Sequence, residues 1–250
     1  MIWSLKVILP VLALLLGSPS CSTSNSDLQI GENLSTMKFS HEKEVFTDTV
    51  YLSDFATAVH FESKQKVHEL PVALSFDRCE FRSPVYAARK GERLMGTSIS
   101  FGESSFTSSL DLSGTNLSQS MDLFGALIGG DLKIDDCFVG NRLELRSVNV
   151  AGELRVTEGY LGDVQGARMI VQGGSTFQRT TIIRGLSLME AELNGYADFS
   201  YVSCFGNAFL DLLKNDDRVV LDHATFHQHL SMANIDWPEK SMRFMTVGIE

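Results

Sequence analysis

The chain has 250 residues, of which 44% are hydrophobic, and its formal net charge is −10 at pH 7. The length allows one long domain or two short ones. The acidic balance argues against nucleic acid as a partner, because the phosphate backbone is itself anionic. Beyond that exclusion, acidity indicates no more than a soluble surface.

An export signal is predicted at the N-terminus. Lys6 is the only charged residue before Cys21, and residues 7–16 form an apolar run that only Pro10 interrupts. The run is shorter than the ~20 residues that a membrane-spanning helix needs, and it fits the core of a signal peptide. We therefore assign residues 1–20 to a signal peptide.

The junction after this signal resembles that of bacterial lipoproteins. Ser18-Pro19-Ser20-Cys21 is followed by the polar run STSNSD, and in that family the cysteine becomes the lipidated first residue of the mature chain. The resemblance implies lipid attachment at Cys21 and a place in the bacterial cell envelope, on the periplasmic or surface side of a membrane. Ser18 departs from the family, which usually carries Leu there, so simple cleavage after Ser20 is the alternative.

Two further segments precede the repeats. Residues 21–37 are rich in Ser, Asn and Gly, which predicts a flexible tether. Residues 38–73 are predicted to cap the repeat array, because its open end exposes backbone edges and core. One helical face in this cap would be lined by Leu52, Phe55, Ala56 and Val59. A first strand at Val59 and Phe61 is the alternative.

An eleven-residue repeat runs through residues 74–237. An apolar residue recurs at its first, third and eighth places, and a small or medium residue at its sixth. One residue is lost after Leu154, and the same register then continues. The first place is held by Ile99, Leu110, Met121, Leu132, Leu143, Leu154, Val164, Ser175, Leu186, Ala197, Ala208, Val219 and Leu230.

This register predicts an all-β parallel solenoid. Apolar first and third places flank a polar second place, as in a short strand with one face buried, and the sixth and eighth places repeat the pattern. Two units then close one coil of four short faces, so residues 22 apart in the sequence stack. A helix is rejected because its interior glycines would each cost about 1 kcal/mol, whereas corners suit them. About seven coils at ~4.8 Å each would make a rod of roughly 35 Å.

Three segments break the pattern. Residues 83–96, with their cluster of basic side chains, are predicted to leave the coil as a loop. Asn215 puts a polar residue at the eighth place and predicts a local bulge. Pro238 ends the ladder, and residues 238–250 are predicted to form a C-terminal cap or a tail that binds a second molecule.

The stretch MDLFGALIGGDLKI, residues 121–134, resembles the pentapeptide-repeat proteins. The resemblance extends from Leu74 to about Ile235 and implies a right-handed quadrilateral parallel β-helix. The chain departs from that family by stepping five residues and then six between inward pairs, which implies a slightly wider coil. The motif defines an architecture and is nearly silent on activity.

The cysteines carry no metal-binding pattern, since no CxxC pair exists. Cys79 and Cys137 fall on the sixth place and Cys204 on the eighth, which predicts small buried hydrophobic residues. Cys79 and Cys137 lie several coils apart and are too far from each other for a disulfide.

Candidate chemistry is sparse. Asp222, His223, His227 and His229 could hold a transition metal, but their places in the repeat diverge, and a solvated corner is favoured. Second-place acids could form paired carboxylates for acid–base work or Ca²⁺ binding, although short corners leave no wall for a cleft. These acids are Asp111, Asp122, Glu144 and Asp198, with Lys133 and Arg155 between them.

Two further polar sets are interpreted as solvated surface. The second-place acids are interpreted as surface acids among interspersed bases, and Asp135, Asp136 and Asp163 are interpreted in the same way. A patch for an anionic glycan is the alternative to a salt-bridged surface for Arg142, Arg146, Arg155, Arg168, Arg179 and Arg184. No nucleotide-binding, hydrolase or metalloprotease motif stands where it would matter, so we predict no catalytic residue, no cofactor and no metal.

The sequence therefore predicts a non-enzymatic envelope lipoprotein, anchored to the membrane through Cys21. Its solenoid face or end would bind a protein partner or a second copy. The alternative is a carbohydrate-binding or carbohydrate-active β-helix. Nucleic-acid mimicry, which some acidic pentapeptide-repeat proteins show, fits poorly with export.

Overall fold

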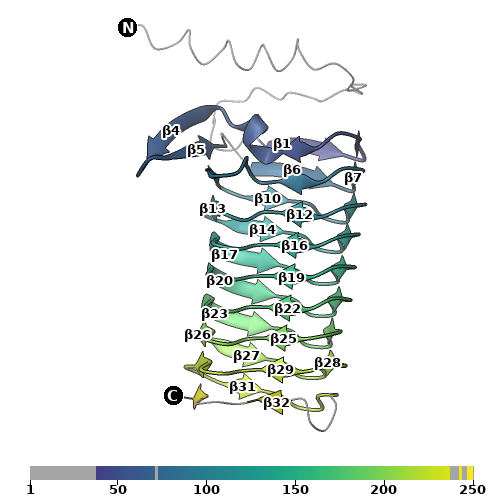
Figure 1. Cartoon of the computed structure of the whole chain (residues 1–250), viewed down its shortest axis with the longest axis vertical. Helices are drawn as coiled ribbons and strands as arrows, with labels where there is room; N and C mark the ends of the chain where they lie inside the picture. The colour runs from purple at the N-terminus through teal and green to yellow at the C-terminus, as the bar shows by residue number, and fades with distance from the viewer. Residues whose placement is uncertain (1–37, 71–72, 237–241, 244–246, 250) are drawn as a thin grey trace, which may run out of the picture.

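The computed structural model describes residues 38–70, 73–236, 242–243 and 247–249. Over these residues the chain forms a parallel β-solenoid of about seven coils with turns of about 22 residues, drawn as a rod in Figure 1. The signal peptide, the tether and Cys21 lie outside the described residues. The one helix assigned in the described chain is the short 3-10 helix η2, Leu52–Phe55. The predicted fold class is thereby confirmed.

Each coil has four faces, which we number in chain order. Face 1 holds β1 (Lys38–Glu42), β6 (Ala73–Asp77), β10 (Ile99–Ser100), β14 (Ser120–Asp122), the second halves of β17 (Phe138–Glu144), β20 (Tyr160–Gln165) and β23 (Thr181–Ser187), then β27 (Asn207–Phe209) and β31 (Leu230–Ser231). Face 2 holds β2 (Val45–Phe46), β7 (Glu80–Phe81), β11 (Ser105–Phe106), β15 (Leu127–Ile128), β18 (Asn149–Val150), β21 (Ile170–Val171), β24 (Glu192–Leu193) and β28 (Lys214–Asn215).

The other two faces complete the coil. Face 3 holds β3 (Val50–Tyr51), β8 (Val85–Tyr86), β12 (Leu110–Asp111), β16 (Leu132–Lys133), β19 (Leu154–Arg155), β22 (Ser175–Thr176), β25 (Ala197–Asp198), β29 (Val219–Val220) and β32 (Met242–Arg243). Face 4 holds β5 (Gln65–Glu69), β9 (Glu92–Gly96), β13 (Thr115–Leu117), the first halves of β17, β20 and β23, then β26 (Ser203–Cys204), β30 (Thr225–Phe226) and β33 (Gly248–Ile249). β4 (Ala58–Glu62) pairs with β5 as an antiparallel hairpin.

The predicted stacking of residues 22 apart is confirmed on face 3. Leu110 pairs in register with Leu132, and Leu132 pairs with Leu154. The next step joins Leu154 to Ser175, one residue shorter, as the lost residue predicts. First-, third-, sixth- and eighth-place side chains line the interior and are buried almost throughout. Burying one large apolar side chain contributes about 1.5–3 kcal/mol, so these ladders stabilise the rod.

Two kinds of corner alternate around the coil. Between the third and sixth places the chain makes a tight turn closed by a backbone hydrogen bond, such as Ala126 N–H to the Leu123 carbonyl at 3.0 Å. Between the eighth and first places a wider corner holds three residues, as at residues 129–131 between Ile128 and Leu132. This alternation is the structural basis of stepping by five and then six.

The fifth place of the repeat is left-handed at every tight corner from Glu103 onward. Glycine occupies it only at Gly114 and Gly125, and its other residues with positive φ are Glu103, Asp136, Ser147, Glu158, Arg168, Arg179, Glu190, Tyr201, Leu212, His223 and Asn234. A left-handed residue at this place is what a type II turn requires. Glycine was expected at the corners, but from Glu103 onward only the tight corners at Gly114 and Gly125 have it at the left-handed place.

We expect Leu212→Gly to raise the free energy of unfolding by about 1 kcal/mol, because left-handed backbone costs a non-glycine residue about 1–2 kcal/mol. Leu212 has φ 59° and is 43% exposed, so little packing is lost. Urea unfolding measures the change. Gly125→Ala is the matched control, at φ 65°, and should shift stability in the opposite direction; two shifts of one sign would contradict this account.

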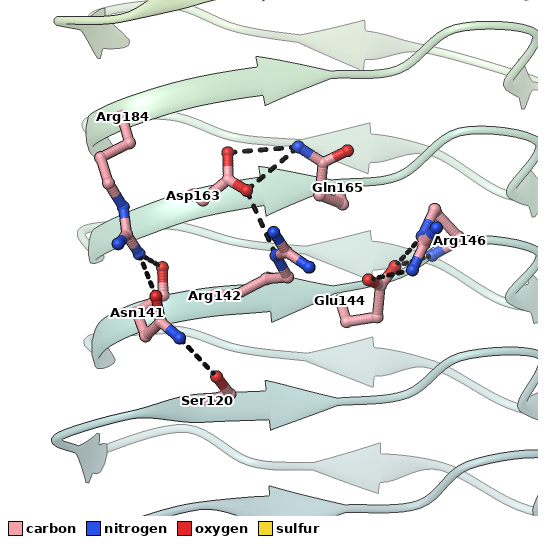
Figure 2. Close-up of polar contacts among 8 residues, drawn as sticks. All are labelled: Ser120, Asn141, Arg142, Glu144, Arg146, Asp163, Gln165 and Arg184. Atoms are coloured by element: carbon pink, nitrogen blue, oxygen red, sulfur yellow. Dashed lines mark hydrogen bonds and ion pairs between the residues drawn. The ribbon is translucent and has the colours of Figure 1, made fainter.

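The lost residue lies at one wide corner. Two residues lie between Leu161 and Val164 at this corner, whereas three residues lie at the equivalent corner of the coil on either side. A Cβ on Gly162 would stand 2.3 Å from the Asn141 carbonyl oxygen, so only glycine fits. Arg184 reaches past this short corner to Asn141, two coils away, where its Nη2 lies 2.7 Å from Oδ1 (Figure 2).

The solenoid begins earlier than predicted. β1, β2 and β3 pair in register with β6, β7 and β8, so the segment from Lys38 already forms coil rather than a separate cap. The proposed helical face is replaced by η2, and Val59 and Phe61 lie on β4, in line with the strand alternative. These short apolar segments follow the ladder because the next coil offers each a strand to pair with.

Two predicted interruptions are wrong. Residues 83–96 do not leave the coil, since β8 and β9 within them pair with β12 and β13. Asn215 stays in β28, in register with Leu193, and is 4% exposed. Its amide donates to the carbonyls of Leu193 at 2.5 Å and Gly195 at 2.7 Å. These bonds satisfy the buried amide, so no bulge is needed.

The C-terminal segment adds strands to the rod. β32 pairs with β29 and β33 with β30, and Val247 packs against the core. Trp237, Phe244 and Met245 lie outside the described residues, so the rest of the predicted cap is untested.

Candidate functional site

Two shallow depressions lie over the outward side chains of opposite faces. The one on face 1 has a volume of about 790 Å³ and is lined by Asp77, Ser100, Asp122, Glu144, Arg142 and Arg146, among others. The one on face 3 has a volume of about 630 Å³ and is lined by Arg155, Thr157, Thr176, Gln178, Tyr196 and Asp198, among others. Both follow columns of second-place residues along the rod axis.

The second-place carboxylates hold the tight turns. Asp111 accepts a hydrogen bond from the Ser113 N–H at 3.0 Å, and Asp122 from the Phe124 N–H at 2.9 Å. Glu144 and Asp198 accept the equivalent bonds from Arg146 and Ser200 at 3.1 and 2.8 Å. Each bond satisfies an N–H at the start of the turn, the usual role of a short polar side chain there.

Two of these acids are not solvated, contrary to the expectation. Glu144 is 5% and Asp198 4% exposed. Arg146 binds Glu144 through two nitrogens, Nε at 2.7 Å and Nη2 at 2.8 Å. This fork compensates the buried carboxylate, and Figure 2 shows it beside the column of face 1.

Asp163 forms the centre of a second network on face 1. Arg142 Nε lies 3.3 Å from Asp163 Oδ2, and Gln165 Nε2 lies 3.2 and 3.1 Å from the two carboxylate oxygens (Figure 2). The carboxylate therefore holds its two neighbours in fixed positions on the face.

On face 1, ionisation of the Asp122 carboxyl is disfavoured. Burial raises the pKa of its carboxyl against the lowering effect of the Phe124 N–H, and the nearby charges of Glu144 and Asp77 raise it further. Asp122 and Glu144 are register partners on neighbouring strands. Stacked carboxylates of like charge disfavour double ionisation.

We expect Asp122→Asn to stabilise the protein slightly at pH 7, by a few tenths of a kcal/mol, as for the loss of a like-charge neighbour. The amide oxygen can still accept from Phe124 N–H. Because the folded-state pKa is raised, wild-type stability recovers as the pH falls through that pKa, so the difference between the two proteins should shrink in acid. Urea titrations between pH 7 and 4 measure it, and a difference that widens in acid would contradict the assignment.

The arginines do not form one patch. They are distributed over two faces and several corners, and five of them pair with an acid. These pairs are Arg142–Asp163, Arg146–Glu144, Arg155–Asp135, Arg168–Glu190 and Arg179–Glu158. Arg184 instead bonds to Asn141. The salt-bridged interpretation is confirmed, and Asp136 likewise pairs with Arg93 at 2.5 Å.

The three histidines of the predicted cluster, His223, His227 and His229, do not converge on a metal site. Each stacks on or packs near an aromatic ring of the preceding coil, as in His223 on Tyr201 at 4.9 Å and His227 on Phe205 at 4.3 Å between ring centroids. His229 lies 6.1 Å from Phe209. Within the described part of the chain, no group of three or more His, Cys, Asp or Glu is placed to hold a metal ion.

Phe138 and Tyr160 form an exposed aromatic pair on face 4. Phe138 and Tyr160 stack at 5.7 Å with 7° between their planes, and they are register partners on neighbouring strands. Each ring therefore covers a face of the other.

The three cysteines among the described residues, Cys79, Cys137 and Cys204, are free and are buried as predicted. Burial raises the pKa of the Cys137 thiol to about 12, and its Sγ lies 3.1 Å from the Leu112 carbonyl oxygen. A thiol with so high a pKa is a poor nucleophile.

No protein-family model matches the chain, and searches of the curated proteins and of the solved structures found no match. Among the described residues, none of the helices has the length and apolar character of a membrane span.

The sequence pattern placed the second-place side chains in outward columns, but it did not reveal that their carboxylates accept hydrogen bonds from the tight turns. The signal that could have identified these hydrogen bonds is an acidic or hydroxyl side chain two residues before a turn residue, as Asp111 stands before Ser113. The pairing of Tyr196 with Asp198 two residues later was also overlooked; the Tyr196 hydroxyl donates to Asp198 at 2.8 Å.

Proposed function

We propose that this protein is a non-enzymatic lipoprotein of the bacterial cell envelope. Cys21 carries the lipid, and the solenoid serves as a rigid structural or protein-binding rod. The proposal joins the export and lipoprotein features of residues 1–21 with the β-solenoid. We also propose a relationship to the pentapeptide-repeat proteins, in which every second corner has gained a residue.

The observation that supports a non-catalytic role is the engagement of the second-place acids. Asp111, Asp122, Glu144 and Asp198 all bond to turn N–H groups. A general acid or nucleophile must be free to contact a substrate, whereas these carboxylates hold the corners. What the faces offer is a regular array of fixed side chains, which suits an extended partner.

The anchor is tested by Cys21→Ser in the full chain. Wild type should fractionate with membranes and incorporate a fatty-acid label, and the variant should lose both. Cys137→Ser is the control and should keep both, because Cys137 is buried in the rod. Retained label in Cys21→Ser would refute the anchor.

The binding role is tested by photo-crosslinking from the rod in intact cells. A crosslinker in place of exposed Phe124 would report on face 1, and one in place of exposed Leu127 on face 2. A partner that binds one face should give one dominant adduct from one position. Absence of any adduct from positions on all four faces would refute the binding role.

A carbohydrate-binding or carbohydrate-active role is the second candidate, and the depression on face 1 favours it. Three acids, Asp77, Asp122 and Glu144, lie there beside Arg142 and Arg146, and burial raises the pKa of Asp122 as a general acid would need. Glycan-array binding or hydrolysis that Asp122→Asn abolishes would establish this candidate over the first.

A further inference from the structure

The hairpin of β4 and β5 projects from the rod beside β1 (Figure 1). Ser63 and Lys64 form its two-residue turn with φ 49° and 73°, as a type I′ hairpin requires. β5 is fixed to the coil by pairing with β9 and by Glu92, whose carboxylate lies 3.0 Å from Lys66 Nζ and 2.8 Å from His68 Nε2. The base of the hairpin is therefore rigid.

β4 is exposed along its whole length. All five of its residues are exposed, and Val59 is 52% and Phe61 74% exposed. Val59 and Phe61 are two residues apart in the strand, so both side chains lie on the same face of the hairpin. Exposed large apolar side chains next to each other mark a contact surface.

We propose that this hairpin is a phospholipid contact that orients the rod on the membrane. The inference rests on the proposed lipid anchor. The described chain starts at Lys38, in β1, at the same end of the rod as the hairpin. Only residues 22–37 separate that end from Cys21, and about 16 residues span at most ~55 Å. An anchored chain thus keeps the hairpin end of the rod within ~55 Å of the lipid surface, which is within reach of it.

The charge of the hairpin permits this approach. Glu62 and Glu69 balance Lys64 and Lys66, so the hairpin is neutral although the chain carries −10. Bringing it to an anionic bilayer costs less than bringing any acidic face.

The depth of contact is limited by the backbone. The edge of β4 turned away from β5 keeps polar groups that bilayer hydrocarbon would leave unsatisfied. Val59 and Phe61 therefore reach the headgroup and upper acyl region, while the strand edge stays hydrated.

The test uses the full lipidated chain in phosphatidylethanolamine and phosphatidylglycerol vesicles with brominated acyl chains. Phe61→Trp and, as matched control, Leu127→Trp report contact, both in a Trp237→Phe background. Leu127 is 55% exposed on face 2 in the middle of the rod. Brominated lipid should quench the emission of Phe61→Trp at least twofold and should not quench that of Leu127→Trp. Equal quenching of the two variants, or no quenching of either, would overturn the proposal.

Other outcomes are distinguishable. Mass spectrometry of the mature chain reports lipid on Cys21, so failure of the anchor is read separately. In that case, Cys21→Ser protein is titrated with excess vesicles, where a partition too weak to survive membrane fractionation is measured; Phe61→Ser should lower this partition about fivefold, and equal partition of the two proteins would overturn the proposal. A concentration-dependent doubling of mass that Phe61→Ser abolishes, without quenching by bromine, would assign the edge of β4 to a second copy instead.

Discussion

Phe101→Ala should lower the free energy of unfolding by about 3–5 kcal/mol, the range for truncating a fully buried aromatic residue. Phe101 is 0% exposed. It stacks on Phe76 at 5.3 Å and meets Phe106 edge-on at 5.4 Å. The cavity would lie between the rings of Phe76 and Phe81 on the preceding coil and Phe106 on the same coil, and the close-packed ladder cannot collapse to fill it.

Urea unfolding measures the loss, with hydrogen exchange to show where it falls. Coils contact only their neighbours, so protection should fall most in β6, β10 and β14. Phe124→Ala is the matched control, since Phe124 is 41% exposed and contacts Arg146 with its ring; it should cost less than about 1 kcal/mol. Equal losses from the two substitutions would contradict the assigned core.

The ladders were predictable because burial imposes a period on the sequence. A residue that must face inward at every coil is selected for apolar character, so Leu110, Leu132 and Leu154 repeat visibly. Their neighbours on the outer surface are under no such constraint. The same reasoning failed at Asn215, where hydrogen bonds to Leu193 and Gly195 satisfy a polar residue in an apolar column.

Backbone conformation left a weaker trace in the sequence. The left-handed fifth place accepts Leu212 and Tyr201 as well as Gly114, because pairing with the next coil compensates a penalty of about 1–2 kcal/mol. Composition therefore does not reveal the turn. The first coil was missed because the β4–β5 hairpin interrupts the repeat. Phe46 pairs with Phe81 and Val50 with Val85, each 35 residues later instead of about 22.

The candidate site was predictable in place but not in environment. Alternation along a strand turns Asp122 and Glu144 outward, yet outward does not mean solvated when stacked neighbours and Arg146 cover the carboxylate. Glu144 is 5% exposed for that reason. The lateral packing of outer side chains depends on rotamers and partners two residues or one coil away, which a pattern of apolar places does not encode.

Asp198→Ala should destabilise the protein by about 3 kcal/mol at pH 7, because hydrogen bonds to a charged group each contribute about 1.5–3 kcal/mol. Asp198 is 4% exposed. It accepts from the Ser200 N–H and the Tyr196 hydroxyl, both at 2.8 Å, and from Gln178. Truncation would leave the N–H of buried Ser200 unpaired. Asp111→Ala, at the same place on face 3, removes one such bond from a less buried site and should cost about 1 kcal/mol.

The loss should also depend on pH. Burial opposes ionisation of Asp198, but the bonds from Ser200, Tyr196 and Gln178 outweigh it and hold the pKa of the carboxyl below its usual value. A lowered folded-state pKa stabilises the protein fully above the unfolded pKa, near 3.9, and the contribution is lost as the pH falls through the folded value. The gap between wild type and Asp198→Ala should therefore stay constant from pH 7 to 5 and narrow below pH 4. Urea titrations in which the gap stays unchanged down to pH 3 would show that Asp198 acts by packing rather than as a charged acceptor.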